Sequence, residues 1–304
     1  MSRTLLLLLV AIAFAQWGCA EGRTRQEPGE DPGPGARQTL RASSGPAEGS
    51  TFSLLLAALA LRGGANRIGR PSISSDALAA AARRTRDARE NRAACPAGMV
   101  LVSGQYCPEV DQRCTRWLET GGRYAYFRCA EYMRPAKCIT ERKSMRYCID
   151  RDEYVPPGQE LPASGQSWTD AAAVCDSLGK RLCMESEWNF ACEGEEMCPY
   201  PYGFTRDAEI CNADRIDIYR PDGELRDLRE GPAGHPGCVS PFGVHHLSGN
   251  LEEWTTIDGT SPPRPAMKGA YWQPSRNHCR AAQTAHDTFY SGTETGFRCC
   301  KDVD

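Results

Sequence analysis

The sequence predicts a loop-rich α+β domain that is held together by disulfide bonds. From residue 95 onward, short apolar segments alternate with glycine and proline, and only two segments have the pattern of a helix. The 304-residue chain also contains 16 cysteines, many more than a protein of the reducing cytosol usually has. We therefore expect residues 95–304 to form one compact domain that is exported and stabilised by disulfides.

Charge is unevenly distributed along the chain. The formal net charge is −3, but residues 20–94 carry +4 and residues 95–304 carry −8. The predicted domain is therefore acidic. Because a surface that binds a polynucleotide normally has an excess of basic side chains, we expect no nucleic-acid partner.

The first 18 residues have the pattern of an export signal. Arg3 precedes the apolar run Leu5–Phe14, which is too short to span a bilayer. Cleavage after Ala15 would leave all sixteen cysteines available for pairing. The segment around Cys19 also resembles a bacterial lipobox, in which Cys19 would carry a lipid and leave an odd number of cysteines. Both alternatives stay open at this point, and either places the protein in the periplasm or at the cell surface, where a lipid would be its only membrane contact.

Two segments precede the domain. Residues 19–50 are rich in glycine and proline and have few large apolar side chains, which predicts a flexible tether. Residues 51–94 contain an apolar run of about ten residues and an alanine- and arginine-rich stretch, which predict a short helical stalk.

The first predicted helix of the domain begins after Ser167, where Ser167 and Asp170 form a capping pair, and it ends before Gly179. The second extends over residues 184–192. The side chains expected to point into the core are Ala171, Val174, Cys175 and Leu178 in the first helix and Trp188, Ala191 and Cys192 in the second. Trp188 and Trp254 are expected to be core anchors.

Several short motifs follow one another along residues 148–300. They include Trp168-Thr169-Asp170-Ala171, Gly179-Lys180-Arg181-Leu182, Glu185-Ser186-Glu187-Trp188, Tyr200-Pro201-Tyr202-Gly203, Gly249-Asn250-Leu251-Glu252-Glu253-Trp254 and Gly296-Phe297-Arg298-Cys299. In this order they resemble the formylglycine-generating enzyme, or sulfatase-modifying-factor, family. Residues 98–100 and 147–150 look like its opening strands. The resemblance implies a single loop-rich α+β domain related to the core of C-type lectins.

The resemblance also implies two disulfide bonds, Cys175 with Cys299 and Cys192 with Cys279. The sequence does not determine how the additional cysteines pair. For these we expect a bond between Cys198 and Cys211.

The oxidases of this family convert a substrate thiol to an aldehyde with dioxygen and a copper ion that two cysteines hold. The matching stretch, residues 269–279, contains only Cys279, which the resemblance assigns to a structural bond. Soft thiolates suit cuprous ion, so the resemblance implies that copper is not bound. No catalytic or cofactor-binding residue is assigned on this basis.

Calcium is the cofactor that the resemblance implies. The ligands expected at one site are Gly249, Leu251 and Glu253. Those expected at a second site are Asn212, Ala213 and Asp222. Carbonyl and carboxylate oxygens suit calcium, but at the first site His246 replaces the usual Asn or Asp. The alternative for Glu253 is an ion pair with Arg298 or Arg280.

Two classes of function follow. The first is an exported, surface-tethered binding or structural module whose ligand is a protein, a peptide or a glycan. The second is an oxidoreductase of the same family with altered metal ligands, for example a nonhaem iron site built from some of the five histidines. A calcium-dependent carbohydrate binder is a third possibility that rests on the fold alone.

Overall fold

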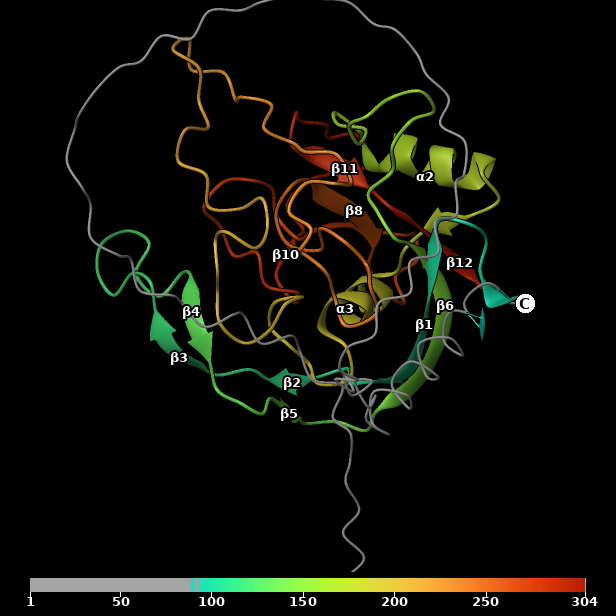
Figure 1. Cartoon of the computed structure of the whole chain (residues 1–304), viewed down its shortest axis with the longest axis horizontal. Helices are drawn as coiled ribbons and strands as arrows, with labels where there is room; N and C mark the ends of the chain where they lie inside the picture. Colours follow the sequence, from blue (N-terminus) through green and yellow to red (C-terminus); the bar gives the residue numbers. More distant parts are fainter. Residues whose placement is uncertain (1–88, 91–92, 304) are drawn as a thin grey trace, which may run out of the picture. The chain divides into compact units, whose positions relative to one another are not determined.

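Two four-stranded β-sheets and two helices form the core of the part of the chain that the computed structural model describes, residues 89–90 and 93–303 (Figure 1). The fold is α+β, as the sequence predicts. The predicted export signal and tether lie outside the described residues, as does almost all of the predicted stalk. No helix in the described part is long and apolar enough to cross a bilayer.

The first sheet has the strand order β1-β6-β12-β7. Its strands are β1 (Met99–Tyr106), β6 (Lys143–Asp150), β12 (Cys299–Asp302) and β7 (Arg181–Leu182). β1 and β6 pair antiparallel along their whole length, from Met99 opposite Asp150 to Tyr106 opposite Lys143. Because β6 lies between β1 and β12, its last four residues are all buried. β1 and β6 are the opening strands that the motifs predict.

The second sheet has the order β10-β9-β8-β11. Its strands are β8 (Glu252–Thr256), β9 (Pro265–Lys268), β10 (Ala282–Gln283) and β11 (Thr295–Phe297). β11 runs parallel to β8 and places Phe297 opposite Trp254. Since β12 begins at Cys299, the chain passes from the second sheet to the first at Arg298.

Helix α2 (Trp168–Ser177) begins as the sequence predicts, because Ser167 accepts a hydrogen bond from the backbone N–H of Asp170. Ala171 and Cys175 are buried. The prediction that Leu178 points inward is wrong, since this residue is 47% exposed. Leu178 is the C-cap and has left the helical conformation, so helical spacing no longer directs its side chain toward the core.

Helix α3 (Glu185–Glu193) contributes the centre of the core. Glu187 accepts a hydrogen bond from the backbone N–H of Met184, which closes the first turn. Trp188, Ala191 and Cys192 are fully buried, which confirms the predicted inward face. Trp254 is also buried, so both tryptophans are core anchors.

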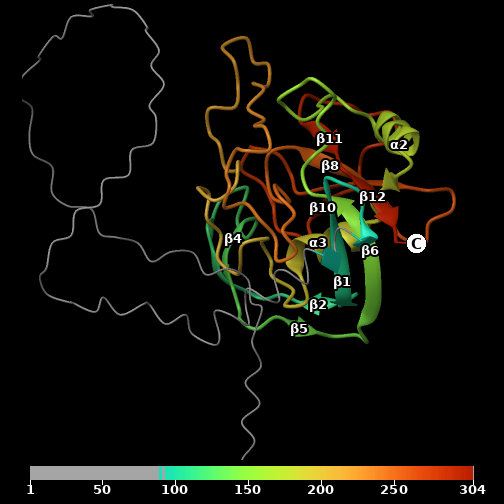
Figure 2. The ribbon, with the colours of Figure 1, turned by 45° about the vertical axis from the view of Figure 1, so that its right-hand side comes forward.

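Residues 107–142 form an accessory segment outside the two sheets. It contains two short ribbons, β2 (Val110–Asp111) with β5 (Lys137–Cys138) and β3 (Cys114–Trp117) with β4 (Cys129–Tyr132). Figures 1 and 2 both place the β2–β5 ribbon at the end of the molecule opposite α2. The accessory segment therefore presents its own surface.

Every cysteine in the described part of the chain is disulfide-bonded. Seven of the bonds are Cys95–Cys148, Cys107–Cys138, Cys114–Cys129, Cys175–Cys299, Cys183–Cys300, Cys192–Cys279 and Cys211–Cys238. Both bonds that the resemblance implies are present. The expected bond between Cys198 and Cys211 is wrong, because Cys211 pairs with Cys238. The order of the cysteines along the sequence does not show that the loop between residues 211 and 238 brings its two ends together.

The long-range bonds should contribute most to stability. Replacing Cys175 and Cys299 with alanine is expected to lower the unfolding free energy by about 5 kcal/mol, because the bond closes a loop of 124 residues. The Cys114–Cys129 bond closes a loop of 15 residues, and its removal should cost about 3 kcal/mol. Urea unfolding of the two double variants measures the difference, and equal losses would contradict the chain-entropy account.

Candidate functional site

The segment of residues 269–280, which joins β9 to β10, is the candidate site. It begins with a tight reversal, in which Gly269 and Ala270 both have positive φ angles of 80° and 55°. The carbonyl of Gly269 accepts a hydrogen bond from the backbone of Gly249, at 2.9 Å. A Cβ at Gly269 would lie 3.3 Å from the Trp188 ring. Glycine is therefore needed both for the conformation and for the close approach of the helix α3 side chain.

Buried polar atoms without partners are concentrated in this segment. The part of the chain that is described has eight such side-chain atoms, and four lie in residues 272–278. They are Trp272 Nε1, Ser275 Oγ, Asn277 Oδ1 and His278 Nδ1. Most buried polar groups in proteins are hydrogen-bonded. A donor, a hydroxyl, an amide oxygen and an imidazole nitrogen in one short segment are the groups that a polar ligand or an ion would satisfy.

His278 is a neutral imidazole within a cationic environment. Burial, and to a smaller degree the positive charges of Lys268, Arg276, Arg206 and Arg280, together lower its pKa to about 3. Its ring also lies edge-on to Tyr132, with 6.1 Å between the ring centres. At neutral pH the side chain therefore carries no proton on one ring nitrogen and can accept a hydrogen bond or bind a metal.

Three of these cations are paired with carboxylates. Lys268 Nζ lies 3.1 Å from Glu185 Oε1, Arg206 Nη2 lies 2.7 Å from Asp214 Oδ1, and Arg280 Nη2 lies 2.5 Å from Glu193 Oε1. Arg276 differs, because it is exposed and its guanidinium stacks over the Phe127 ring at 5.2 Å. Arg276 is therefore the cation of this set that is available to a ligand from solvent.

The accessory segment helps to hold the candidate site. Arg206 donates to Asp214 and, at 2.9 Å, to the carbonyl of Ser275. Arg128, from the end of the β3–β4 hairpin, donates to the same Asp214 carboxylate at 2.9 Å. Asp214 thus joins the hairpin to the segment. At the other end, the bond between Cys192 and Cys279 fixes the segment to α3.

A second polar centre lies beneath the candidate site. Arg298 forms a two-pronged ion pair with Glu253, at 2.6 Å from Nη2 to Oε1 and 2.7 Å from Nε to Oε2. Trp188 Nε1 also donates to Glu253 Oε2, at 2.8 Å. All three side chains are fully buried. Both carboxylate oxygens of Glu253 are therefore already engaged.

Glu153 is a second buried carboxylate at this centre. Its Oε1 accepts a hydrogen bond from the backbone of Leu251 at 3.0 Å, and its Oε2 accepts one from Asn250. Burial and the charge of Glu253 raise the pKa of Glu153 to about 8. His246 Nδ1 lies 3.8 Å from Glu153 Oε2, and burial lowers the pKa of that histidine. The single guanidinium of Arg298 faces the carboxylates of both Glu253 and Glu153, so Glu153 keeps its proton at neutral pH.

This geometry bears on the first expected calcium site. Gly249, Leu251 and Glu253 lie next to each other, but Arg298 supplies the positive charge that Glu253 requires. Of the two alternatives for an ion pair, the structure has Arg298, while Arg280 pairs with Glu193. With Glu253 paired in this way, the first residue set does not fit a calcium ion.

The second expected set is divided. Asn212 is buried, and its Nδ2 donates to the carbonyl of Leu228 at 2.8 Å and to Asn250 Oδ1 at 3.0 Å. Its Oδ1 has no hydrogen-bond partner in the part of the chain that the structure describes. Asp222, in contrast, lies in an exposed turn and accepts a hydrogen bond from the backbone of Glu224. The structure therefore does not bring Asn212 and Asp222 into one buried site.

The histidines do not converge. His235 contacts Glu230, His245 contacts Asp152, and His246 donates its Nε2–H to the carbonyl of Gly234. Among the described residues, no group of three or more His, Cys, Asp or Glu side chains could hold a metal ion.

Sequence reasoning did not identify Glu153, Arg206 or Asp214. Each lies in irregular structure outside a helix or strand, so no periodicity marks it. For Glu153, the available signal was the run of four charged residues that begins at the end of β6, residues 150–153.

Comparison with known proteins identifies the family. Residues 108–303 match the family described as the sulfatase-modifying factor enzyme 1-like domain. The chain belongs to this family. The family match confirms the resemblance that the motifs indicate. It covers the accessory segment from residue 108 onward and every strand of the two sheets except β1.

The relatives of this sulfatase-modifying-factor domain are named as different kinds of protein. The chain is 27% identical over 178 residues to the formylglycine-generating enzyme of Bos taurus, covering 50% of this chain and 46% of the bovine protein. It is 30% identical over 159 residues to the inactive C-alpha-formylglycine-generating enzyme 2 of Mus musculus, covering 47% and 50%. It is 24% identical over 216 residues to the serine/threonine-protein kinase pkn1 of Chlamydia caviae, covering 64% and 32%. The chain thus spans half or less of the length of these relatives.

Solved structures with a similar arrangement include PvdO from Pseudomonas aeruginosa, with a TM-score of 0.46 and 16% identity over 67% of this chain and 94% of PvdO. CarF has a TM-score of 0.46 and 14% identity over 69% of this chain and 99% of CarF.

The buried carboxylates should make stability depend on pH. Glu153 has its ordinary pKa near 4.5 when unfolded and about 8 when folded, so the folded state binds more protons between these values. The unfolding free energy should therefore fall as pH rises from about 4.5 to about 8, by up to about 1.4 kcal/mol per pH unit. Glu252, whose pKa burial and Glu294 raise to about 7, contributes in the same direction.

Replacing Glu153 with glutamine should flatten this dependence, because glutamine does not titrate. Urea unfolding at several pH values measures the slope, and Glu160→Gln, at an exposed carboxylate, is the matched control. An unchanged slope in Glu153→Gln would contradict the assignment of the proton to Glu153.

Proposed function

We propose that this protein is an exported, surface-tethered binding module of the sulfatase-modifying-factor family that does not carry out copper-dependent thiol oxidation. The observation that carries this proposal is the state of Cys279. It is bonded to Cys192, and residues 269–278 contain no cysteine.

Copper chemistry of the family type needs free thiolates. Cuprous ion prefers soft sulfur ligands, and every cysteine in the described part of the chain is in a disulfide. This supports the loss of the copper pair. The same cysteine content supports export, because disulfides persist in oxidising compartments. A lipid on Cys19 would place the protein at a membrane surface, and cleavage after Ala15 would release it.

The candidate site keeps features of a binding site. Unpartnered buried atoms of Trp272, Ser275, Asn277 and His278 supply both donors and acceptors, and the exposed guanidinium of Arg276 lies beside them in the sequence. Small numbers of fixed polar groups near aromatic side chains give a ligand its orientation. A polar group of a protein, peptide or glycan ligand suits this set.

The names of the relatives are compatible with loss of activity. One is called a formylglycine-generating enzyme, another an inactive form, and a third a protein kinase. A domain that occurs in proteins with such different names can serve as a scaffold for different sites.

Titration with cuprous ion tests the proposal. The purified protein should bind cuprous ion weakly and should consume no oxygen when a cysteine-containing peptide is added. The formylglycine-generating enzyme of Thermomonospora curvata, which is 27% identical over 172 residues, is the positive control for the assay. Tight binding of copper together with turnover of the peptide would overturn the binding-module proposal.

The second candidate is an oxidoreductase with altered metal ligands. The observation that favours it is the neutral imidazole of His278 beside Asn277, each with a buried atom that lacks a partner. Metal analysis of the protein as purified, compared with His278→Ala, tests this alternative. A stoichiometric transition metal that the variant loses would support it.

We also propose that calcium binds near Asn212, supported by the unpartnered Oδ1 of that side chain and by the preference of calcium for oxygen ligands. Added calcium should raise the midpoint of thermal unfolding, because a ligand stabilises the state that binds it. Asn212→Ala should abolish this calcium-dependent rise, whereas Asp222→Ala should keep it. Because Asn212 also donates to Leu228, the readout is the difference with and without calcium. No rise in the original protein would contradict the proposal.

A further inference from the structure

The accessory segment differs in charge from the rest of the domain. Residues 107–142 contain seven basic and five acidic side chains, whereas the rest of residues 95–304 contains 16 basic and 26 acidic ones. The accessory segment is therefore a local region of positive charge on an acidic body. An anionic group approaching the domain is attracted here and repelled elsewhere.

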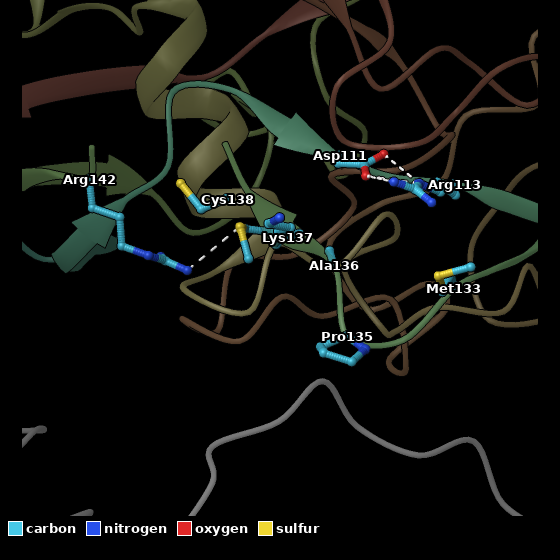
Figure 3. A pocket seen from close by; sticks show the side chains of 9 residues that line it. Asp111, Arg113, Met133, Pro135, Ala136, Lys137, Cys138 and Arg142 are labelled. Atoms are coloured by element: carbon cyan, nitrogen blue, oxygen red, sulfur yellow. Dashed lines mark hydrogen bonds and ion pairs between the residues drawn. The ribbon is translucent and has the colours of Figure 1, made fainter. Parts of the chain in front are cut away.

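A pocket of about 470 Å³ lies in this segment, beside the β2–β5 ribbon (Figure 3). Its volume is within the range of ordinary ligand pockets. Apolar side chains of Met133, Pro135 and Met197 line it. Met133 is about half exposed, at 46%, so an apolar side chain of a ligand could cover it. Methionine adapts its shape to different apolar partners.

Three cationic side chains also line the pocket, with one acidic one. In the view of Figure 3, Arg142 and Arg113 lie toward opposite ends, with Lys137 between them. Arg113 is paired with Asp111, at 2.6 Å. Arg142 donates to the carbonyl of Gln105 at 2.8 Å. The Lys137 ammonium forms no hydrogen bond or ion pair with the residues that the structure describes. Asp111 lies opposite Lys137 in the ribbon and interacts with it electrostatically, but Asp111 is paired with Arg113, so the ammonium can still bind the anionic group of a ligand.

The pocket is held in one conformation before any ligand arrives. The bond between Cys107 and Cys138 links β5 to the chain just before β2. Gln112 Nε2 donates to the carbonyl of Met197 at 2.8 Å, which attaches the ribbon to the loop after α3. A preorganised pocket loses less entropy on binding than a flexible one.

We propose that this pocket binds an acidic peptide segment of a partner protein, with a carboxylate on Lys137 and an apolar side chain against Met133 and Pro135. The apolar lining favours a peptide over a small inorganic anion. The acidic remainder of the domain disfavours a long polyanion such as nucleic acid. This inference is independent of the candidate site at residues 269–280, since it rests on different residues.

Fluorescence anisotropy with a labelled hexapeptide, Glu-Leu-Glu-Phe-Glu-Leu, tests the proposal on the whole protein. We expect saturable binding that weakens as salt is raised. A Glu-Ser-Glu-Ser-Glu-Ser peptide tests the apolar contact, and a Lys-Leu-Lys-Phe-Lys-Leu peptide tests the charge. Both should bind at least about tenfold more weakly.

Two variants locate the binding. Lys137→Glu should weaken binding of the acidic apolar peptide by about tenfold or more, because it replaces an attraction with a repulsion. Arg264→Glu makes the same change in net charge at an exposed position that does not line the pocket, and it should bind the peptide almost as the original protein does. Circular dichroism verifies that both variants fold.

Three results would overturn the proposal. One is the absence of saturable binding by the acidic apolar peptide. Another is equal binding of the serine peptide, which would indicate attraction of charge without a pocket. The third is an equal loss of affinity in Lys137→Glu and Arg264→Glu, which would indicate that only net charge matters.

Discussion

The guanidinium of Arg298 is the contact on which the arrangement of the two sheets depends. It lies where the chain leaves β11 and enters β12, and it is fully buried. Besides its ion pair with Glu253, it donates to the carbonyls of Asp150, Arg151 and His245. All five of its N–H groups therefore have acceptors. A buried charge is tolerated only under such conditions, so β6, β8 and the loop at His245 must meet around it.

The candidate site inherits its rigidity from this centre. Trp188 donates to Glu253 on one side and packs against Gly269 on the other, so the ion pair also sets the start of the segment of residues 269–280. The end of that segment is set by the bond between Cys279 and Cys192. Between these fixed ends lie polar atoms that have no hydrogen-bond partner among the described residues. A scaffold that is rigid at both ends and polar in the middle is suited to binding.

Cysteine has a structural use throughout the described part of this chain. Cys279 is part of the scaffold, because its bond to Cys192 fixes the end of the candidate site to α3. Other disulfides, among them Cys107–Cys138 and Cys114–Cys129, hold the accessory segment. Disulfide bonds thus stabilise both the core and the accessory segment.

The sequence by itself determined the fold class, the position of both helices and the opening strands, because these depend on local periodicity, capping residues and contiguous motifs. Ser167 and Gly179 delimit α2 from local chemistry alone. Only the tertiary structure decided the partners of isolated side chains. Cys211 pairs with Cys238, Glu253 pairs with Arg298, and Glu153 lies beside His246. Each depends on how loops distant in sequence meet in space, and no local pattern records that.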